Sequence, residues 1–174
     1  MNTGEQRKPV IFTNIDGVLH PHGAVLMRDG TVRMRDDRYV LFQWSGPLIE
    51  IVREFNADVV LRSSWTSRLP LYQVLSLMPP QLASAVAGVT QPIATSRLDR
   101  TQCRSRYEVV REYVAWQGFT RWVALDDVLD CWPDTERERL VLCDESGLSR
   151  LLTELELRER LLRWRTDGST DAMN

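Results

Sequence analysis

The chain has 174 residues, of which 43% are hydrophobic, so it can bury a sizeable core as one domain spanning residues 1–174 without disulfides. Its net charge of -2 excludes a general electrostatic attraction to nucleic acid or to anionic membranes, although local basic patches remain compatible with it. Cys103, Cys131 and Cys143 include no Cys-x-x-Cys pair, and no apolar run approaches the roughly 18 residues of a transmembrane helix, so we expect a reduced, cytoplasmic protein.

The first element is a short apolar run within residues 10–19 that ends in two polar residues and a glycine. Such a run, rich in β-branched residues, predicts a strand buried on both faces at the centre of a parallel sheet. Asn14 and Asp16 would then lie at its C-terminal edge, where open α/β sheets bind ligands. Gly17 allows the chain to turn sharply beyond them. We therefore regard Asn14 and Asp16 as candidates for chemistry.

A β-hairpin is predicted directly after this strand, within a segment of about 20–44. Asp29-Gly30 between two apolar arms is a strong turn signal. The hairpin would hang over the edge that carries the polar residues. It is either a small flap that helps to gate the site or an edge hairpin without a gating role. His20 and His22 beside it are expected to be ordinary loop residues rather than metal ligands.

The next elements are a helix and a second buried strand. Ser45-Gly46-Pro47 opens the helix, because proline suits a first turn, and its apolar face consists of Leu48, Ile51, Val52 and Phe55. The strand covers residues 58–62 and ends at Ser63 and Ser64. Because a strand, a helix and another strand follow one another, the sheet should be parallel.

Two short helices are predicted over residues 70–78 and 81–87, with a short extra strand over 86–90. Ser105 is followed three residues later by Glu108, which is the pattern of a helix-capping box. This helix has an apolar face formed by Val109, Val110, Tyr113 and Val114.

The last strands are predicted over residues 122–125, ending at Asp126 and Asp127, and over residues 140–143. A final amphipathic helix follows, with an expected buried side formed by Leu151, Leu152, Leu155 and Leu162. Residues 167–174 should be disordered, as chain ends often are.

Polar residues follow three of the predicted strands at the point where each strand ends. They are Asn14 and Asp16, Ser63 and Ser64, and Asp126 and Asp127. Parallel strands bring these three ends to one edge of the sheet. The sequence therefore predicts a three-layer, Rossmann-like α/β fold, a parallel sheet flanked by helices, with one polar site at its carboxyl edge.

The segment from Asn14 to Leu19 resembles motif I of the haloacid dehalogenase-like (HAD) hydrolases, Asp-x-Asp-Gly-Val-Leu, with Asn14 in place of the first Asp. The resemblance implies a magnesium-dependent phosphohydrolase that acts through an aspartyl-phosphate. It implies that Asp16 donates a proton to the leaving group. An amide is a poor nucleophile, so the covalent step should fail and the chain as written should have little or no phosphatase activity.

The resemblance extends to three further motifs. Ser63 matches the serine or threonine that hydrogen-bonds the phosphoryl group. The resemblance also implies that Ser64, beside it, and Gly17, in the turn after the first strand, bind the substrate. Arg106 is similar to the cation that steadies the phosphate, and Arg104 is the alternative. Asp126 and Asp127 match the acidic pair that holds magnesium, and Asp130 offers a second spacing. The implied Mg²⁺ ligands, all oxygen donors, are the Asn14 side chain, the backbone carbonyl of Asp16, Asp126 and Asp127.

More narrowly, the chain resembles a small bacterial branch related to the HAD domain of multidomain RNA-repair proteins, over roughly residues 9–160. The shared segments are Asp-Gly-Val-Leu-His-Pro, Ser-Ser-Trp, Gly-Val-Thr-Gln-Pro, Arg-x-Glu-Val, Leu-Asp-Asp and Gly-Leu-Ser. The implied partner is a phosphorylated substrate, either a small molecule or a nucleic-acid end, with no membrane involved.

Simpler explanations exist for single motifs. Ser63 and Ser64 can merely cap the next helix, Arg106 can be a surface residue, and an Asp-Asp pair is usually a solvated loop. Tryptophans such as Trp65 and Trp116 belong more often to a core or its rim than to a base-stacking platform.

Asn14 leaves two hypotheses about function. In the first, the nucleophile of an active phosphatase has been replaced deliberately by an amide that traps the ligand. In the second, the chain is a natural pseudoenzyme that binds a phosphorylated ligand or a protein partner without turnover. The first is favoured, because a pseudoenzyme would be free to lose Asp16 and the acidic pair as well.

Overall fold

The computed structural model describes residues 8–90, 105–129 and 132–166, without the side chains of residues 165 and 166. Several predictions fall outside these residues and stay predictions. They concern the tail 167–174, Arg104, Asp130, Cys103 and Cys131.

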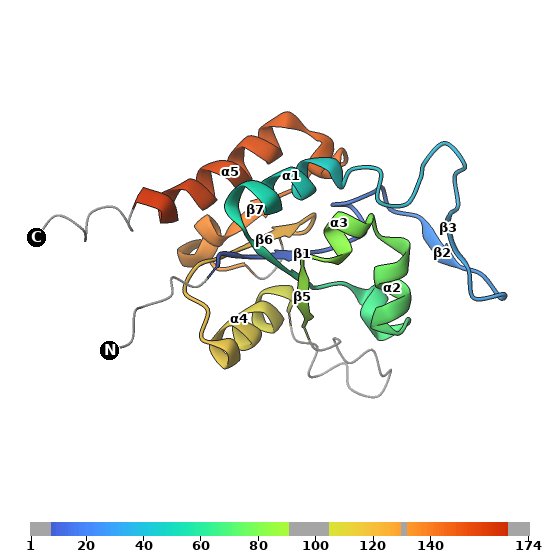
Figure 1. Cartoon of the computed structure of the whole chain (residues 1–174), viewed down its shortest axis with the longest axis horizontal. Coiled ribbons are helices and arrows are strands. Elements are labelled where there is room, and N and C mark those ends of the chain that lie inside the picture. Colours follow the sequence, from blue (N-terminus) through green and yellow to red (C-terminus); the bar gives the residue numbers. More distant parts are fainter. Residues whose placement is uncertain (1–7, 91–104, 130–131, 167–174) are drawn as a thin grey trace, which may run out of the picture.

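The centre of the fold is a five-stranded parallel sheet with the strand order β5-β4-β1-β6-β7 (Figure 1). Its strands are β1 (Val10–Thr13), β4 (Asp58–Leu61), β5 (Val86–Val89), β6 (Trp122–Asp126) and β7 (Leu140–Leu142). The first strand lies between β4 and β6 and is buried along its whole length. The predicted central position of this apolar strand is confirmed.

Helices cover both faces of the sheet (Figure 1). Alternate strand residues point to opposite faces, and they pack into two separate cores: Ile11 lies in one and Phe12 in the other. The Ile11 core contains buried residues of α1 (Gly46–Phe55), α2 (Leu71–Leu77), α3 (Pro80–Ala83) and α5 (Leu151–Thr166). The Phe12 core contains buried residues of α4 (Arg106–Gln117). The expected three-layer, Rossmann-like α/β fold is confirmed.

Two helices form for the reasons expected from sequence. The first helix, α1, has Pro47 in its first turn and buries all four residues of its predicted apolar face. Ser105 and Glu108 make both hydrogen bonds of a capping box at the start of α4. This cap matters for the site, because it sets the position of Arg106 at the first helical residue.

Two other predictions were wrong. The helix expected over residues 81–87 ends at Ala83, because Val86 already begins β5. In α5 the leucines expected on the buried side are exposed, by 64% at Leu151, 62% at Leu152, 50% at Leu155 and 45% at Leu162, whereas Leu157 and Leu161 are buried. Leucines lie on both sides of this helix, so hydrophobicity alone does not decide which side packs on the sheet.

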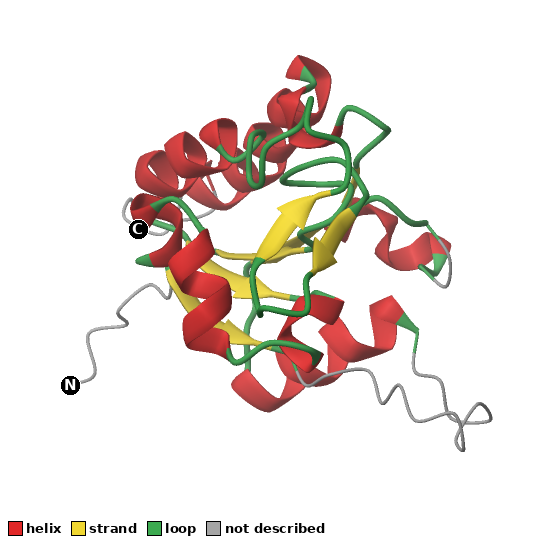
Figure 2. Ribbon diagram, turned by 90° about the vertical axis from the view of Figure 1, so that its right-hand side faces the viewer, coloured by secondary structure: helices red, strands yellow, loops and turns green. Residues whose placement is uncertain are grey.

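The predicted hairpin consists of β2 (Ala24–Leu26) and β3 (Val32–Met34), which pair antiparallel as a sheet of their own. Gly30 adopts a positive φ in the turn, and its carbonyl accepts a hydrogen bond of 2.9 Å from the side chain of Gln73 in α2. Figure 2, viewed from the hairpin side, shows the hairpin in front of the main sheet.

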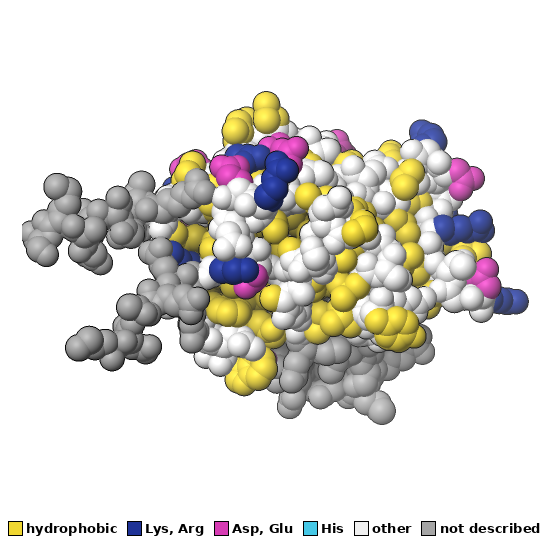
Figure 3. Space-filling view, viewed as in Figure 1, with side chains coloured by type: hydrophobic (Ala, Val, Ile, Leu, Met, Phe, Trp, Pro, Cys, Tyr) yellow, Lys and Arg dark blue, Asp and Glu magenta, His cyan; other side chains and the backbone are white. Residues whose placement is uncertain are grey.

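Short 3-10 helices complete the described elements: η1 (Ser64–Ser67), η3 (Asp134–Arg139) and η4 (Gly147–Ser149). Among the described side chains in Figure 3, Lys and Arg lie in small groups and form no continuous basic surface on this face. None of the helices within the described ranges is long and apolar enough to span a membrane.

Candidate functional site at the carboxyl edge of the sheet

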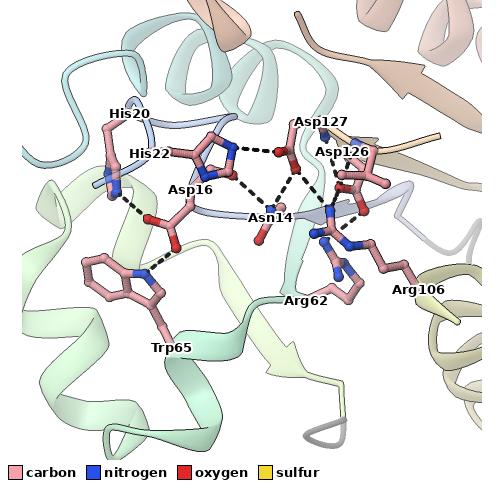
Figure 4. Close-up of polar contacts among 10 residues, drawn as sticks. Asn14, Asp16, His20, His22, Arg62, Trp65, Arg106, Asp126 and Asp127 are labelled. Carbon is pink, nitrogen blue, oxygen red and sulfur yellow. Dashed lines mark hydrogen bonds and ion pairs between the residues drawn. The ribbon is translucent and has the colours of Figure 1, made fainter. Parts of the chain in front are cut away.

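Charged and polar side chains meet where β1, β4 and β6 end (Figure 4). Thr13, the last residue of β1, is in register with Leu61 of β4 and Leu125 of β6. The residues that follow these strands therefore leave the sheet at the same level. The structure brings together Asn14, Asp16, Arg62, Arg106, Asp126 and Asp127.

Asp126 is the most deeply buried carboxylate of the site. Its Oδ1 accepts hydrogen bonds from Nη1 of Arg106 and from the backbone N–H groups of Asp127 and Val128. Its Oδ2 lies 2.8 Å from Nη2 of Arg62. Burial raises the pKa of Asp126, and the charges of Arg62 and Arg106 act in the opposite direction.

Arg62 comes directly after β4 and is only 6% exposed. Burial lowers the pKa of its guanidinium, while the charge of Asp126 opposes this effect. Within the described part of the chain, its Nη2 makes no aligned hydrogen bond, although it lies close to Asp126. The two groups are thus paired by charge rather than by hydrogen-bond geometry, and neither could be removed without leaving a buried charge behind.

Asp127 connects the acidic pair to β1 and to the loop that follows it. Its Oδ1 accepts a hydrogen bond of 3.0 Å from Nη1 of Arg106 and one of 3.0 Å from Nδ2 of Asn14. Its Oδ2 lies 2.7 Å from Nε2 of His22. Burial alone would raise the pKa of Asp127, but the hydrogen bonds around it, including those from Asn14, Arg106 and His22, lower it to about 2.

Asn14 uses its amide nitrogen, not its oxygen, toward the neighbouring oxygens. Nδ2 donates to the backbone carbonyl of Asp16 at 2.9 Å and to Oδ1 of Asp127 at 3.0 Å. The Asp16 carbonyl can only accept a hydrogen bond, and so can the carboxylate of Asp127 when it is ionised. The group of Asn14 that faces these two oxygens must therefore be its N–H₂ group.

These contacts decide how well the site fits a magnesium ion. The residue types are suitable, because Mg²⁺ takes carboxylate, carbonyl and amide oxygens. The arrangement does not fit, because N–H groups already contact the Asp16 carbonyl and both oxygens of each carboxylate in the acidic pair. Within the described residues, no cluster of three or more His, Cys, Asp or Glu side chains is arranged to hold a metal.

Asp16 lies at the other side of Asn14, and its carboxylate points away from the acidic pair (Figure 4). Its Oδ1 lies 3.1 Å from Nε2 of His20, and its Oδ2 accepts a 2.9 Å hydrogen bond from Nε1 of Trp65. The resemblance implies that the Asp16 side chain donates a proton to the leaving group, which stays a prediction. In the structure both of its oxygens have partners.

Gly17 is required by close packing as well as by its backbone angle. Its φ is +76°, and a Cβ added there would lie 2.7 Å from Oδ2 of Asp127 and 2.7 Å from Nε2 of His22. Any other residue would push these two side chains apart. Gly17 therefore allows the contact between His22 and Asp127.

The two serines after β4 have local roles in the structure. The Ser63 hydroxyl accepts a 3.4 Å hydrogen bond from the backbone N–H of Trp65 and caps η1. The Ser64 carbonyl accepts a hydrogen bond from Ser67. Among the described contacts, neither hydroxyl bonds to Asn14, Asp16 or the acidic pair, so a contact with substrate stays a prediction for both.

Four residues of the site were not predicted from sequence: His20, His22, Arg62 and Trp65. Arg62 could have been predicted from the sequence, because a charged residue directly after an apolar strand lies at the edge of the sheet where the site was expected. The histidines and Trp65 carried no such signal, since their partners depend on how the loop after β1 folds back. The expectation that both histidines are ordinary loop residues overlooked their contacts with Asp16 and Asp127.

Comparisons with known proteins identify the family. A search of curated proteins found no match. A family model described as the HAD domain in Swiss Army Knife RNA repair proteins matches residues 10–151. This range includes the sheet, the hairpin and all the site residues described above. HAD proteins typically use Mg²⁺. The chain belongs to this family of HAD domains, and its fold is a phosphohydrolase-type scaffold.

Proposed function

We propose that this chain binds a phosphate monoester at the carboxyl edge of its sheet and does not hydrolyse it through an aspartyl-phosphate. The observation that carries the proposal is the state of Asn14. It occupies the nucleophile position of motif I, and its amide nitrogen is bonded to Asp127 and to the Asp16 carbonyl. The lone pair of an amide nitrogen is delocalised, and the uncharged amide oxygen is a far weaker nucleophile than a carboxylate.

Arg106 is the cation that a ligand can reach. Its side chain is 31% exposed, against 7% for Arg62. A phosphate would exchange part of the contact between Arg106 and Asp127 for its own oxygens, and guanidinium groups suit phosphate geometry. Arg62 would remain with Asp126 and keep the buried charge of that carboxylate compensated.

The proposal assigns no magnesium ion to the chain as it stands. The change Asn14→Asp would remove the amide nitrogen from the Asp16 carbonyl and from Asp127, and it would add the carboxylate oxygens that HAD chemistry uses. We expect both Mg²⁺ binding and turnover to appear with this single substitution, with the metal displacing the exposed His22 side chain from Asp127. The pseudoenzyme hypothesis differs only in that the Asn14→Asp variant would stay inactive.

The ligand is a phosphate ester of a small molecule or of a nucleic-acid end. The family description, which names RNA repair proteins, supports the second source, whereas the net charge of -2 adds no electrostatic support. The cytoplasmic location stays a prediction.

The first test compares the unsubstituted chain with Asn14→Asp on p-nitrophenyl phosphate, with and without Mg²⁺. The variant should exceed the unsubstituted chain by at least ~100-fold, and only with the metal, because a catalytic nucleophile is worth that much or more. The double variant Asn14→Asp/Asp127→Asn is the matched control and should be inactive. Equal turnover by the unsubstituted chain would overturn the proposal.

A second set of measurements tests the binding of phosphate and of Mg²⁺ in the absence of turnover. Calorimetric titration of the unsubstituted chain with inorganic phosphate should show binding that Arg106→Met abolishes. Titration with Mg²⁺ should raise the thermal stability of Asn14→Asp alone, by about 1.4 kcal/mol at a tenfold excess over its Kd. A Mg²⁺ effect of equal size in the unsubstituted chain would contradict the arrangement described for Asn14.

A further inference from the structure

A buried aromatic cluster of His20, Phe42 and Trp65 lies against Asp16. Its ring centroids are 5.4 Å apart for His20 and Phe42, 5.5 Å for His20 and Trp65, and 5.8 Å for Phe42 and Trp65. All three side chains are buried. Rings that pack on one another from two sides have little freedom to rotate. Any group that the cluster presents to Asp16 is therefore held in place.

His20 can present only an N–H group to Asp16. Its Nδ1 accepts a 3.1 Å hydrogen bond from the backbone N–H of Phe42, so this nitrogen carries a lone pair. In a neutral imidazole the proton is then on Nε2, which lies 3.1 Å from Oδ1 of Asp16. The backbone N–H of Gly17 donates a hydrogen bond to the His20 carbonyl. This bond closes the short loop and places His20 next to Asp16.

Trp65 presents a second N–H group to the other oxygen. Its indole Nε1 donates to Oδ2 of Asp16 at 2.9 Å, and an indole nitrogen can only donate. Its place is set by η1, which Ser63 caps through the backbone N–H of Trp65 itself. The serine after β4 thus acts on Asp16 through the tryptophan.

We propose that His20 and Trp65 are positioning residues that hold the Asp16 carboxylate between two fixed, uncharged N–H donors. The cluster sets the direction of Asp16, so that the carboxyl group meets the leaving-group oxygen of a phosphate ester in one orientation. This consequence rests on the proposed function, because Asp16 acts on an ester only if the scaffold is a phosphohydrolase.

The step in question can be written for the Asn14→Asp variant. The introduced carboxylate attacks phosphorus, the bond from phosphorus to the ester oxygen breaks, and the proton on Asp16 passes to that oxygen to give an alcohol. In the second half, Asp16 takes a proton from the water that hydrolyses the aspartyl-phosphate. A protonated carboxyl group can still accept at both oxygens, so the contacts with His20 and Trp65 keep it aligned in both protonation states.

The kinetic test is the change Trp65→Phe in the Asn14→Asp background, with an alkyl phosphate and p-nitrophenyl phosphate as substrates. An alkoxide needs a proton to leave, whereas nitrophenolate does not. We expect kcat to fall about tenfold on the alkyl ester, a part of what a general acid supplies, with KM unchanged and nitrophenyl turnover nearly unchanged. Asp16→Asn in the same background removes the acid completely, so it gives the largest fall in kcat on the alkyl ester that loss of this proton transfer can cause.

Trp132→Phe is the matched control. Trp132 is as buried as Trp65, at 6% exposed, and among the described residues its Nε1 has no hydrogen-bond partner. The control should leave the ratio of the two substrates unchanged. An equal fall on both substrates for Trp65→Phe would mean a merely structural role and would overturn the proposal.

A second test uses the unsubstituted chain and needs no activity. Trp65→Phe identifies the indole N–H signal of Trp65 in a proton–nitrogen NMR spectrum, and Asp16→Asn should shift that signal while the Trp132 signal stays in place. Nitrogen shifts of His20 should show a protonated Nε2 and an unprotonated Nδ1. An unmoved Trp65 signal or the opposite tautomer would overturn the proposal. Inactivity of Asn14→Asp on both esters would overturn only the proposed function.

Discussion

Asp126 and Asp127 have arginine side chains as partners, whereas Asp16 receives its contacts from two uncharged N–H groups. The charge of the acidic pair is therefore compensated inside the protein. The carboxyl group of Asp16 is oriented by neutral donors instead of being paired with an arginine. Asp16 and the acidic pair lie on opposite sides of Asn14 and therefore have different electrostatic surroundings.

The difference follows from the elements that supply the partners. Arg62 follows β4, on the other side of β1 from β6, and its side chain reaches Asp126 at the end of β6, whereas Arg106 lies at the start of α4. His20 and Trp65 come from the loop after β1 and from η1. The acidic pair is consequently the part of the site that stability should depend on most, and Asp16 the part that chemistry should depend on most.

The largest effect is expected from Arg62→Leu. It removes one partner of the buried pair with Asp126, and breaking such a pair costs about 3 to 5 kcal/mol of unfolding free energy, of which the remaining contact between Arg106 and Asp126 recovers a part. Urea denaturation measures it. The control is Arg38→Leu, since Arg38 forms an equally close pair with Asp36 at the surface, and it should not move the midpoint measurably. Similar midpoints for both variants would mean that the buried pair contributes no more than a surface pair.

Substitution of the two histidines distinguishes the Asp16 part of the site from the Asp127 part, because His20 contacts Asp16 and His22 contacts Asp127. His20→Ala should cost about 3 to 4 kcal/mol, because it empties a buried space and leaves the Phe42 N–H without its acceptor. His22→Ala should cost less than about 0.5 kcal/mol, because the His22 side chain is 67% exposed and exposed ion pairs contribute little. Thermal denaturation of both variants checks this order, and a larger loss for His22→Ala would reverse the comparison.

A smaller effect, with a defined pH range, is expected from Asp127→Asn. The pKa of Asp127 is lowered from 3.8 to about 2 on folding, so ionised Asp127 stabilises the fold above pH 3.8 and this contribution disappears as the pH falls toward 2. The variant should be less stable by about 1 to 2 kcal/mol at neutral pH, after allowance for partial exposure.

The difference between Asp127→Asn and the unsubstituted chain should shrink between pH 4 and 2. Denaturant titrations at several pH values measure it. Asp127 is itself one of the causes that raise the pKa of Asp126, so the measured difference also contains the change at Asp126, which has the opposite sign. Stability curves that run parallel down to pH 2 would show that the hydrogen bonds to Asp127 do not hold its charged form.

Much of the fold followed from local patterns. The apolar strands, the Asp29-Gly30 turn, the proline-led α1 and the capping box of α4 each have a signal within a few residues. The polar strand ends could also be placed at one edge, because parallel strands leave no other arrangement. The orientation of α5 could not be predicted, since leucines occur on both of its sides.

Local residue patterns were enough to predict the sheet, the edge that carries the site and the amide at the nucleophile position. The donor that each oxygen receives depends on how distant segments pack together. Arg62, His20 and Trp65 act on carboxylates that are distant in sequence or reached through a folded-back loop, and hydrogen bonds depend on distances of a few tenths of an ångström. Such distances are set by packing of the whole core, which no local pattern of residues encodes.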